Sequence, residues 1–340
     1  MAADCLTAMS NKRPTLDVFL SYGGSVCAGH PDGRARIAAS LRGLCGTKHR
    51  LHAFRQCDKR ILFSVHDRRL IRYLSQAESH LKREEVLKAE VVPSGVNPKR
   101  SIADWRLQAS YFVQDSITPV TRSIYRVAAR AASACVAASR LLLSSNTALC
   151  FAACRPPGHH ATRTKSGGYC YLNNASIAAH YLSGHGRVAV LDIDYHHGNG
   201  TQDIFYDRRD VLCVSLHGPP DQAYPYCSGF ADETGRGDGV GFNMNVVLPQ
   251  VTDDSTYLRY LDGGICRVKE HRPRYLVVSL GFDIMRGDPA GRFVVSAEGL
   301  AGIASHIAEL DLPTLVVLEG GYNDRNITNG TRSFFAGWWS

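Results

Sequence analysis

The residues with the clearest chemical potential are two carboxylates and two imidazoles in residues 191–200, which read LDIDYHHGNG. The apolar residues 188–191 lead into them and favour a buried parallel strand. Side chains alternate along a strand, so Asp192, Asp194 and His196 share one face if the chain stays extended. Such oxygen and nitrogen donors suit zinc or ferrous iron. For this segment alone, a strand end whose side chains are simply solvated is the competing interpretation.

Polar motifs also follow four other apolar runs. RPPGHH follows Cys154, SLHG follows Val214, GFD follows Leu280 and EGGY follows Leu318. In an open parallel sheet, ligands bind beyond the carboxyl ends of the strands. Five motifs in this position therefore predict a functional site at one edge of the sheet.

The hydrophobic pattern predicts an α/β fold in which helices cover both faces of a parallel sheet. Strands are expected at residues 16–21, 149–154, 188–193, 211–216, 275–280 and 314–318. Helices are expected at residues 34–44, 66–74, 120–143, 173–183, from 202 onward for a short stretch, 255–269 and 296–310. We predict a single domain over residues 1–340. Within it, residues 76–120 form a loop excursion for substrate access or a dimer contact.

Composition limits the partners and the compartment. The 340 residues are 44% hydrophobic, enough for a large core. The net charge of +8 is dispersed along the sequence, so we expect no nucleic-acid partner. Eleven cysteines without a CxxC pair favour reduced thiols over a disulfide framework. We see no signal peptide and no stretch long enough to span a membrane, and we therefore predict a cytoplasmic protein.

The motifs RPPGHHA, GGYCYLNNASIAA, LDIDYHHGNGTQDIFY, SLGFD and EGGY make residues 155–322 resemble the histone deacetylase superfamily, zinc-dependent amide hydrolases with an arginase-like fold. Within it, the chain is most similar to bacterial acetylpolyamine amidohydrolases and the related class II deacetylases. The resemblance implies a three-layer αβα sandwich around a mostly parallel sheet, and a homodimer. It also implies an enzyme that removes acetyl groups from an acetylpolyamine or acetyl-lysine.

The resemblance places the catalytic metal, zinc or alternatively Fe²⁺, on Asp194, His196 and Asp283. Three protein ligands leave positions open for water and a substrate carbonyl, as a catalytic zinc requires. Tyr322 follows two glycines, which allow the tight turn that would bring its hydroxyl to the developing oxyanion.

Two adjacent histidines, His159 and His160, would supply the proton transfers. The resemblance pairs His159 with Asp192 and His160 with Asn199. A carboxylate raises the pKa of an imidazole and a neutral amide does not. We therefore predict His160 as general base and acid and His159 as a cationic helper, with the reverse assignment left open.

The resemblance also implies a narrow substrate tunnel and bound potassium. Gly168, Tyr169 and Tyr224 would line the tunnel, where flat aromatic faces suit methylene groups. A structural K⁺ would be held by main-chain oxygens and one hydroxyl, from Asp192, Asp194, His196, Leu216 and Ser215. A second cation is expected near Phe205, Arg208 and Val211.

Alternatives remain for the substrate and for the class of protein. Ala290 follows Asp288 and Pro289 at a gate where an acid would meet a distant ammonium, so a protein or peptide lysine deacetylase without polyamine preference stays open. A non-catalytic acetyl-binding protein would be expected to lack a metal ligand, a histidine of the pair or Tyr322. A binuclear manganese hydrolase of the arginase type needs further carboxylates, whereas residues 197–199 read HGN.

Overall fold

A central sheet of eight strands organises the computed structural model, which describes residues 15–21, 30–89, 102–145 and 147–340. The strands are β1 (Leu16–Leu20), β2 (His49–His52), β5 (Leu149–Ala153), β6 (Val188–Asp192), β7 (Val211–His217), β8 (Asn243–Val247), β9 (Tyr275–Leu280) and β10 (Thr314–Leu318). Their order is β2-β1-β5-β10-β9-β6-β7-β8, and every neighbouring pair is parallel. The five strands that end in polar motifs are consecutive in this order, so the motifs share one edge as predicted.

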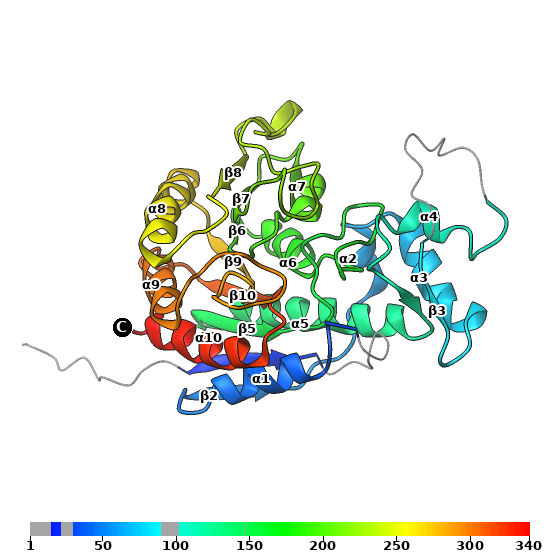
Figure 1. The fold of residues 1–340 in the computed structure, drawn as a ribbon, viewed down its shortest axis with the longest axis horizontal. Helices are drawn as coiled ribbons and strands as arrows, with labels where there is room; N and C mark the ends of the chain where they lie inside the picture. The colour runs from blue at the N-terminus through cyan, green and yellow to red at the C-terminus, as the bar shows by residue number, and fades with distance from the viewer. Residues whose placement is uncertain (1–14, 22–29, 90–101, 146) are drawn as a thin grey trace, which may run out of the picture.

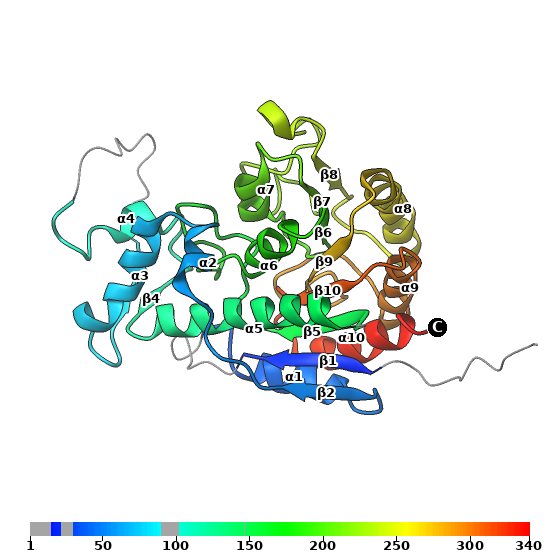
Figure 2. The same cartoon turned by 180° about the vertical axis from the view of Figure 1, so that it is seen from behind.

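Helices cover both faces of this sheet (Figures 1 and 2). One layer contains α1 (Ala35–Gly43), α8 (Asp254–His271), α9 (Ala297–Ala308) and α10 (Asp324–Gly337), and the other contains α5 (Ile124–Ser144), α6 (Asn174–Ser183) and α7 (Asn199–Phe205). Successive side chains of β6 alternate between the two cores: Val188 and Val190 face one, Ala189 and Leu191 the other. This double burial explains the continuous apolar runs and confirms the predicted three-layer αβα fold.

The described residues between β2 and α5 lie beyond the edge at which the strands end (Figure 1). They contain α2 (Lys59–Phe63), α3 (Arg68–His80), α4 (Ala109–Phe112) and a small antiparallel sheet of β3 (Val86–Leu87) and β4 (Val120–Thr121). The predicted loop over residues 76–120 is therefore partly wrong, because α3 continues to His80 with its apolar face packed on α5. Residues 90–101 of that prediction lie outside the described residues.

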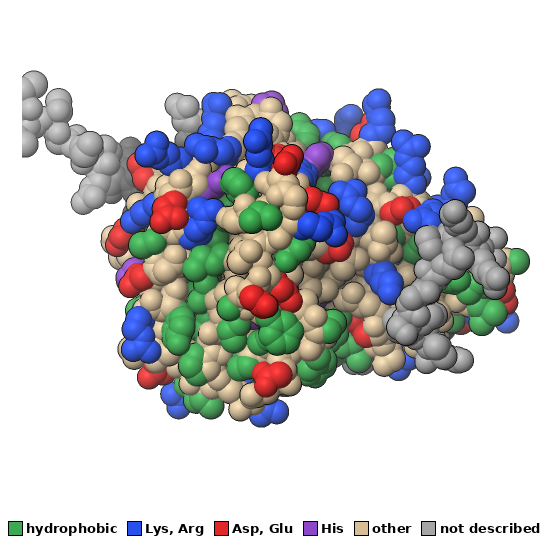
Figure 3. All heavy atoms as spheres, turned by 90° about the horizontal axis from the view of Figure 1, so that it is seen from above, with side chains coloured by type: hydrophobic (Ala, Val, Ile, Leu, Met, Phe, Trp, Pro, Cys, Tyr) green, Lys and Arg blue, Asp and Glu red, His purple; other side chains and the backbone are tan. Residues whose placement is uncertain are grey.

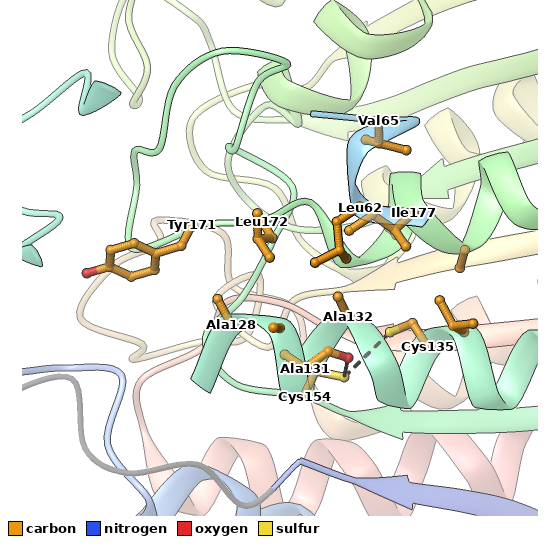
Figure 4. Close-up of a cluster of buried hydrophobic side chains, with 14 of the residues drawn as sticks. Leu62, Val65, Ala128, Ala131, Ala132, Cys135, Cys154, Tyr171, Leu172 and Ile177 are labelled. Atoms are coloured by element: carbon orange, nitrogen blue, oxygen red, sulfur yellow. Dashed lines mark hydrogen bonds between the residues drawn. The ribbon is translucent and has the colours of Figure 1, made fainter. Parts of the chain in front are cut away.

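Helix α5 packs closely on its neighbours because its buried face is rich in small residues. Figure 4 shows Ala128, Ala131, Ala132 and Cys135 of this helix beside apolar side chains of neighbouring segments. In the described part of the chain, α5 alone is long and apolar enough to cross a membrane, contrary to our expectation that no stretch is. Two thirds of its apolar window is buried inside the fold (67%), as is typical of a core helix.

Surface charge is mixed on the face shown in Figure 3, where Lys and Arg side chains are interspersed with acidic and apolar ones. Exposed cations pair with acids close by, as Arg60 does with Asp58 at 2.6 Å and Arg236 with Asp207 at 2.7 Å. The positive net charge is therefore partly neutralised locally. The predicted lack of a nucleic-acid partner stays a prediction.

Candidate active site

Three side chains converge beyond the ends of β6 and β9: Asp194, His196 and Asp283. One ligand atom from each lies within 4.8 Å of the others. His196 Nδ1 is 3.2 Å from an oxygen of either carboxylate. Both aspartates are fully buried, and burial together with the charge of Asp194 raises the pKa of Asp283 to about 6. Two buried carboxylates this close to one imidazole are stable as anions only when a cation balances their charge.

The backbone packs closely around these carboxylates. The Gly320 N–H donates to Asp194 Oδ2 at 2.7 Å, and the Tyr195 N–H donates to Asp283 Oδ1 at 3.0 Å. A Cβ on Gly320 would lie 2.2 Å from Asp283 Oδ2 and 2.5 Å from Asp194 Oδ2. A Cβ on Gly281 would lie 2.3 Å from Asp194 Oδ2. Two carboxylates and an imidazole in this glycine-lined cradle fit zinc or ferrous iron.

The side chains of Asp192, Asp194 and His196, at and after the end of β6, are directed by a route that differs from the predicted one. β6 ends at Asp192, and the chain bends over residues 194–196 instead of staying extended. Asp192 Oδ1 accepts the Asp194 N–H at 3.1 Å, and Asp194 Oδ1 accepts the His196 N–H at 2.9 Å. Each aspartate thus caps the amide two residues further on. These successive turns, not strand alternation, direct the side chains into the site.

The histidine pair lies on the loop after β5, with its two rings 3.9 Å apart. His159 Nδ1 is 3.0 Å from Asp192 Oδ2, and His160 Nδ1 is 2.8 Å from Asn199 Oδ1, so both pairings inferred from the resemblance are present. Burial lowers the pKa of His159, but the neighbouring aspartates outweigh it and raise that pKa to about 10. Burial, and then the neighbouring imidazoles, lower the pKa of His160 well below its ordinary value.

Tyr322 is placed by the turn that follows β10. Its N–H donates to Asp288 Oδ2 at 2.8 Å, and the Arg36 guanidinium lies over its ring at 4.9 Å. The ring meets that of Tyr169 edge-on at 5.6 Å. Burial holds the pKa of Tyr322 well above its ordinary value, so the hydroxyl keeps its proton and can donate a hydrogen bond.

Two of the residues predicted to line a tunnel, Gly168 and Tyr224, lie against His160. The ring of Tyr224 meets His160 edge-on at 4.8 Å, and a Cβ on Gly168 would lie 2.2 Å from His160 Cδ2. Gly168 and Tyr169 have φ angles of +55° and +66°. A positive φ is strained for tyrosine, and such strain is common at functional sites.

The predicted potassium positions lie at adjoining strand ends. Asp192 and Ser215 are register partners in β6 and β7, and the Ser215 hydroxyl is 2.8 Å from His217 Nδ1. At the second predicted position, the Phe205 carbonyl accepts the Arg208 N–H at 2.9 Å. Potassium at either place stays a prediction.

Three residues of this region are missing from the set proposed from the sequence. Glu319 Oε2 accepts the Gly158 N–H at 2.6 Å, and Glu319, Cys170 and His159 bring ligand atoms within 4.8 Å of one another. Glu319 and Cys170 belong to the quoted motifs EGGY and GGYC and could have been singled out there. Asp115, described below, follows none of the predicted strands, and only the tertiary structure brings it to the site.

Comparisons with known proteins show which family and which relatives the chain is similar to. The sequence profile of the histone deacetylase domain matches residues 30–338. The chain is 43% identical to an acetylpolyamine amidohydrolase of Burkholderia pseudomallei over 231 residues, which are 68% of this chain and 67% of that protein. It is 42% identical to acetylpolyamine amidohydrolase 2 of Pseudomonas aeruginosa over 62% of each chain. The crystal structure of an acetylpolyamine aminohydrolase from Burkholderia pseudomallei superposes with a TM-score of 0.88 at 32% identity and covers 95% of this chain and 98% of that one.

Proposed function

The chain belongs to the histone deacetylase family, and from this premise we propose that it is a metal-dependent deacetylase that cleaves the acetyl amide of an N-acetylated amine. The observation that carries the proposal is the convergence of Asp194, His196 and Asp283 within 4.8 Å beside the histidine pair. A candidate metal site, a candidate base and a candidate oxyanion donor are the components that amide hydrolysis requires.

Zinc, or Fe²⁺ in its place, would be held by Asp194, His196 and Asp283. When bound, such an ion acts as a Lewis acid that makes water more acidic and polarises an amide carbonyl. The chain's own contribution is a fixed donor geometry, maintained by the N–H groups of Gly320 and Tyr195. Such outer hydrogen bonds keep metal ligands oriented.

The two histidines take different parts in proton transfer. His160 is neutral at pH 7 because its pKa lies well below the ordinary value, so it can accept the proton of the attacking water. It then returns that proton to the leaving amine. His159, whose pKa is about 10, stays cationic and stabilises the negative charge that develops nearby. This contrast supports His160 as the general base.

Tyr322 donates its hydroxyl hydrogen to the carbonyl oxygen as that oxygen gains negative charge. The hydroxyl needs no ionisation for this task, and its raised pKa keeps it protonated. Tyr169 and Tyr224 hold the methylene chain of the substrate and exclude water from the reacting bond.

The preferred substrate of this proposal is an acetylpolyamine, because relatives at 43% and 42% identity carry that activity in their names. An acetyl-lysine peptide is the second candidate, and the gate region favours it. There, Asp288 accepts backbone N–H groups of Ala290, Tyr322 and Asn323 and is itself buried. It is thus not free to meet a distant ammonium group.

Turnover measurements separate these candidates. Acetylputrescine, acetylspermidine and an acetyl-lysine peptide are compared at equal concentration with the zinc-loaded protein. We expect kcat/KM at least tenfold higher for the acetylpolyamines. Comparable rates on the peptide would favour the second candidate, and no turnover of any acetyl amide would refute the proposed function.

A further inference from the structure

One carboxylate, Asp115, joins the loops that carry two of the tunnel residues. Its Oδ2 accepts the Gly168 N–H at 2.7 Å and the Tyr224 hydroxyl at 2.7 Å. Its Oδ1 accepts the Ile117 N–H at 3.1 Å. Segments that follow α4, precede α6 and follow β7 therefore meet at a single half-buried side chain.

The hydroxyl of Tyr224 is fully engaged in this arrangement. It donates to Asp115 and accepts a hydrogen bond from Gln114 Nε2 at 2.8 Å. Burial, together with the Asp115 carboxylate, holds the pKa of Tyr224 well above its ordinary value. The hydroxyl therefore stays protonated as a donor. A phenylalanine ring would supply the same flat surface without these bonds.

Gly168 and Tyr224, the two walls of the predicted tunnel, have little freedom to move relative to His160. Gly168 approaches so closely that an added Cβ would lie 2.2 Å from His160 Cδ2 and 2.9 Å from Tyr224 Cε1. The Tyr224 ring lies 4.8 Å from His160, edge-on. A shift of either wall therefore changes the space beside the candidate base.

We propose that Asp115 is a positioning residue that sets the tunnel width by holding Gly168 and Tyr224 against His160, and that it does not bind substrate itself. Its Oδ2 already accepts two short hydrogen bonds, one from each wall. The substrate class that fits such a gap is an acetyl group on an unbranched primary alkylamine, because a narrow gap between a glycine and an aromatic ring admits methylene groups and excludes a branch. This inference depends on the proposed deacetylase function.

The consequence is a coupling between Asp115 and the hydroxyl of Tyr224. If the carboxylate acts through the wall, removing either partner disorders the same wall, and removing both adds little more. A misplacement of about 1 Å can cost on the order of 100-fold in rate. For Asp115→Asn, whose amide NH₂ replaces the oxygen that accepts either the Ile117 N–H or the two wall hydrogen bonds, we expect about a tenfold loss in kcat with a smaller change in KM.

The test is a double-mutant cycle of Asp115→Asn and Tyr224→Phe on the zinc-loaded enzyme. Substrates are acetylputrescine and its analogue with a methyl branch beside the amide nitrogen. Each single variant should lose about tenfold in kcat on acetylputrescine, and the double variant about the same. The preference for the unbranched substrate should fall in parallel. The exposed neighbours Asp221 and Tyr226 provide matched controls, Asp221→Asn and Tyr226→Phe, which should keep kcat within twofold.

Two results would overturn the positioning role of Asp115. Losses that multiply to about 100-fold in the double variant would show that the two groups act independently. A rise in KM of equal size for Asp115→Asn with and without the Tyr224 hydroxyl would show that the carboxylate binds substrate. Thermal unfolding of the same four proteins must also show non-additive shifts, and this measurement holds even if no acetyl amide is turned over. A failure of the proposed deacetylase function is thus distinguishable from a failure of the positioning role of Asp115.

Discussion

The substitution Gly320→Ala tests the cradle around the candidate metal ligands by adding one methyl group. Its Cβ would lie 2.2 Å from Asp283 Oδ2 and 2.5 Å from Asp194 Oδ2, whereas ordinary contact begins at 3.4 Å. The Asp283 oxygen would therefore have to retreat by about 1.2 Å, and functional constellations tolerate only about 0.5 Å. The same shift strains the hydrogen bond from the Gly320 N–H to Asp194.

Loss of one outer hydrogen-bond partner typically lowers metal affinity by about 10–100-fold. Because Gly320→Ala displaces two ligands directly, we expect at least a 100-fold loss of zinc affinity and loss of turnover at limiting zinc. The assay is competition with a zinc-chelating dye, with circular dichroism to verify folding. A matched control is Gly263→Ala in α8, where an added Cβ meets nothing within 4 Å. It should bind zinc normally and gain up to about 1 kcal/mol in stability. Unchanged zinc affinity in a folded Gly320→Ala protein would refute the assigned ligand geometry.

Three further outcomes follow from the site. Tyr322→Phe should lower kcat by about 10²–10³ and keep the bound metal, as removal of one oxyanion donor does; full activity would exclude its hydroxyl from the reaction. Asn199→Asp places a carboxylate beside His160 and should raise the pKa of that imidazole, so the acidic limb of the rate profile moves to higher pH; an unmoved limb contradicts the assignment of His160 as base. Burial raises the pKa of Glu319 from 4.5 to about 7, so the folded state binds this proton more tightly than the unfolded state does, and stability falls as pH rises from about 4.5 to about 7. Glu319→Gln lacks this loss, so its free energy of unfolding by urea should rise relative to that of the parent by up to about 3 kcal/mol between pH 5 and pH 8. A difference between the two proteins that does not change with pH would contradict the raised pKa of Glu319.

The sequence predicts most of the central fold because buried parallel strands leave a direct signature. β6, β9 and β10 are almost wholly apolar, and their polar endings reveal the functional edge. Strand β2 escapes prediction because it lies at the edge of the sheet with three of its four side chains exposed. Strand β8 also escapes prediction. It reads NMNVV, and its two asparagines interrupt the apolar pattern because their amides donate to loop carbonyls and to Gln202.

Helix α10 is missed for a different reason. Its polar sequence, DRNITNGTRSFFAG, is poor in strong helix formers. The helix is stabilised instead by Asn323, which caps its first turn through two backbone N–H groups, and by packing on α1 and α9. Capping and tertiary contact here override intrinsic propensity.

The candidate site also contains residues that the sequence reveals and residues that it does not. The chemically distinctive residues can be chosen from motifs, because metal ligands and paired imidazoles need particular side chains. The groups that orient them, Asp115 and Gly320 among them, act through backbone N–H groups and close contact, which sequence spacing does not reveal. Each of the nine cysteines in the described part of the chain is a free thiol. The cytoplasmic location and the homodimer stay predictions.

We propose that one metal ion, held by Asp194, His196 and Asp283, enables the amide cleavage. The decisive experiment is to measure metal content beside turnover of acetylputrescine, before chelation, after chelation and after reloading with zinc. We expect activity to vanish with the metal and to return in proportion up to one zinc ion per chain. A metal-free protein that cleaves the amide at the original rate would contradict the claim.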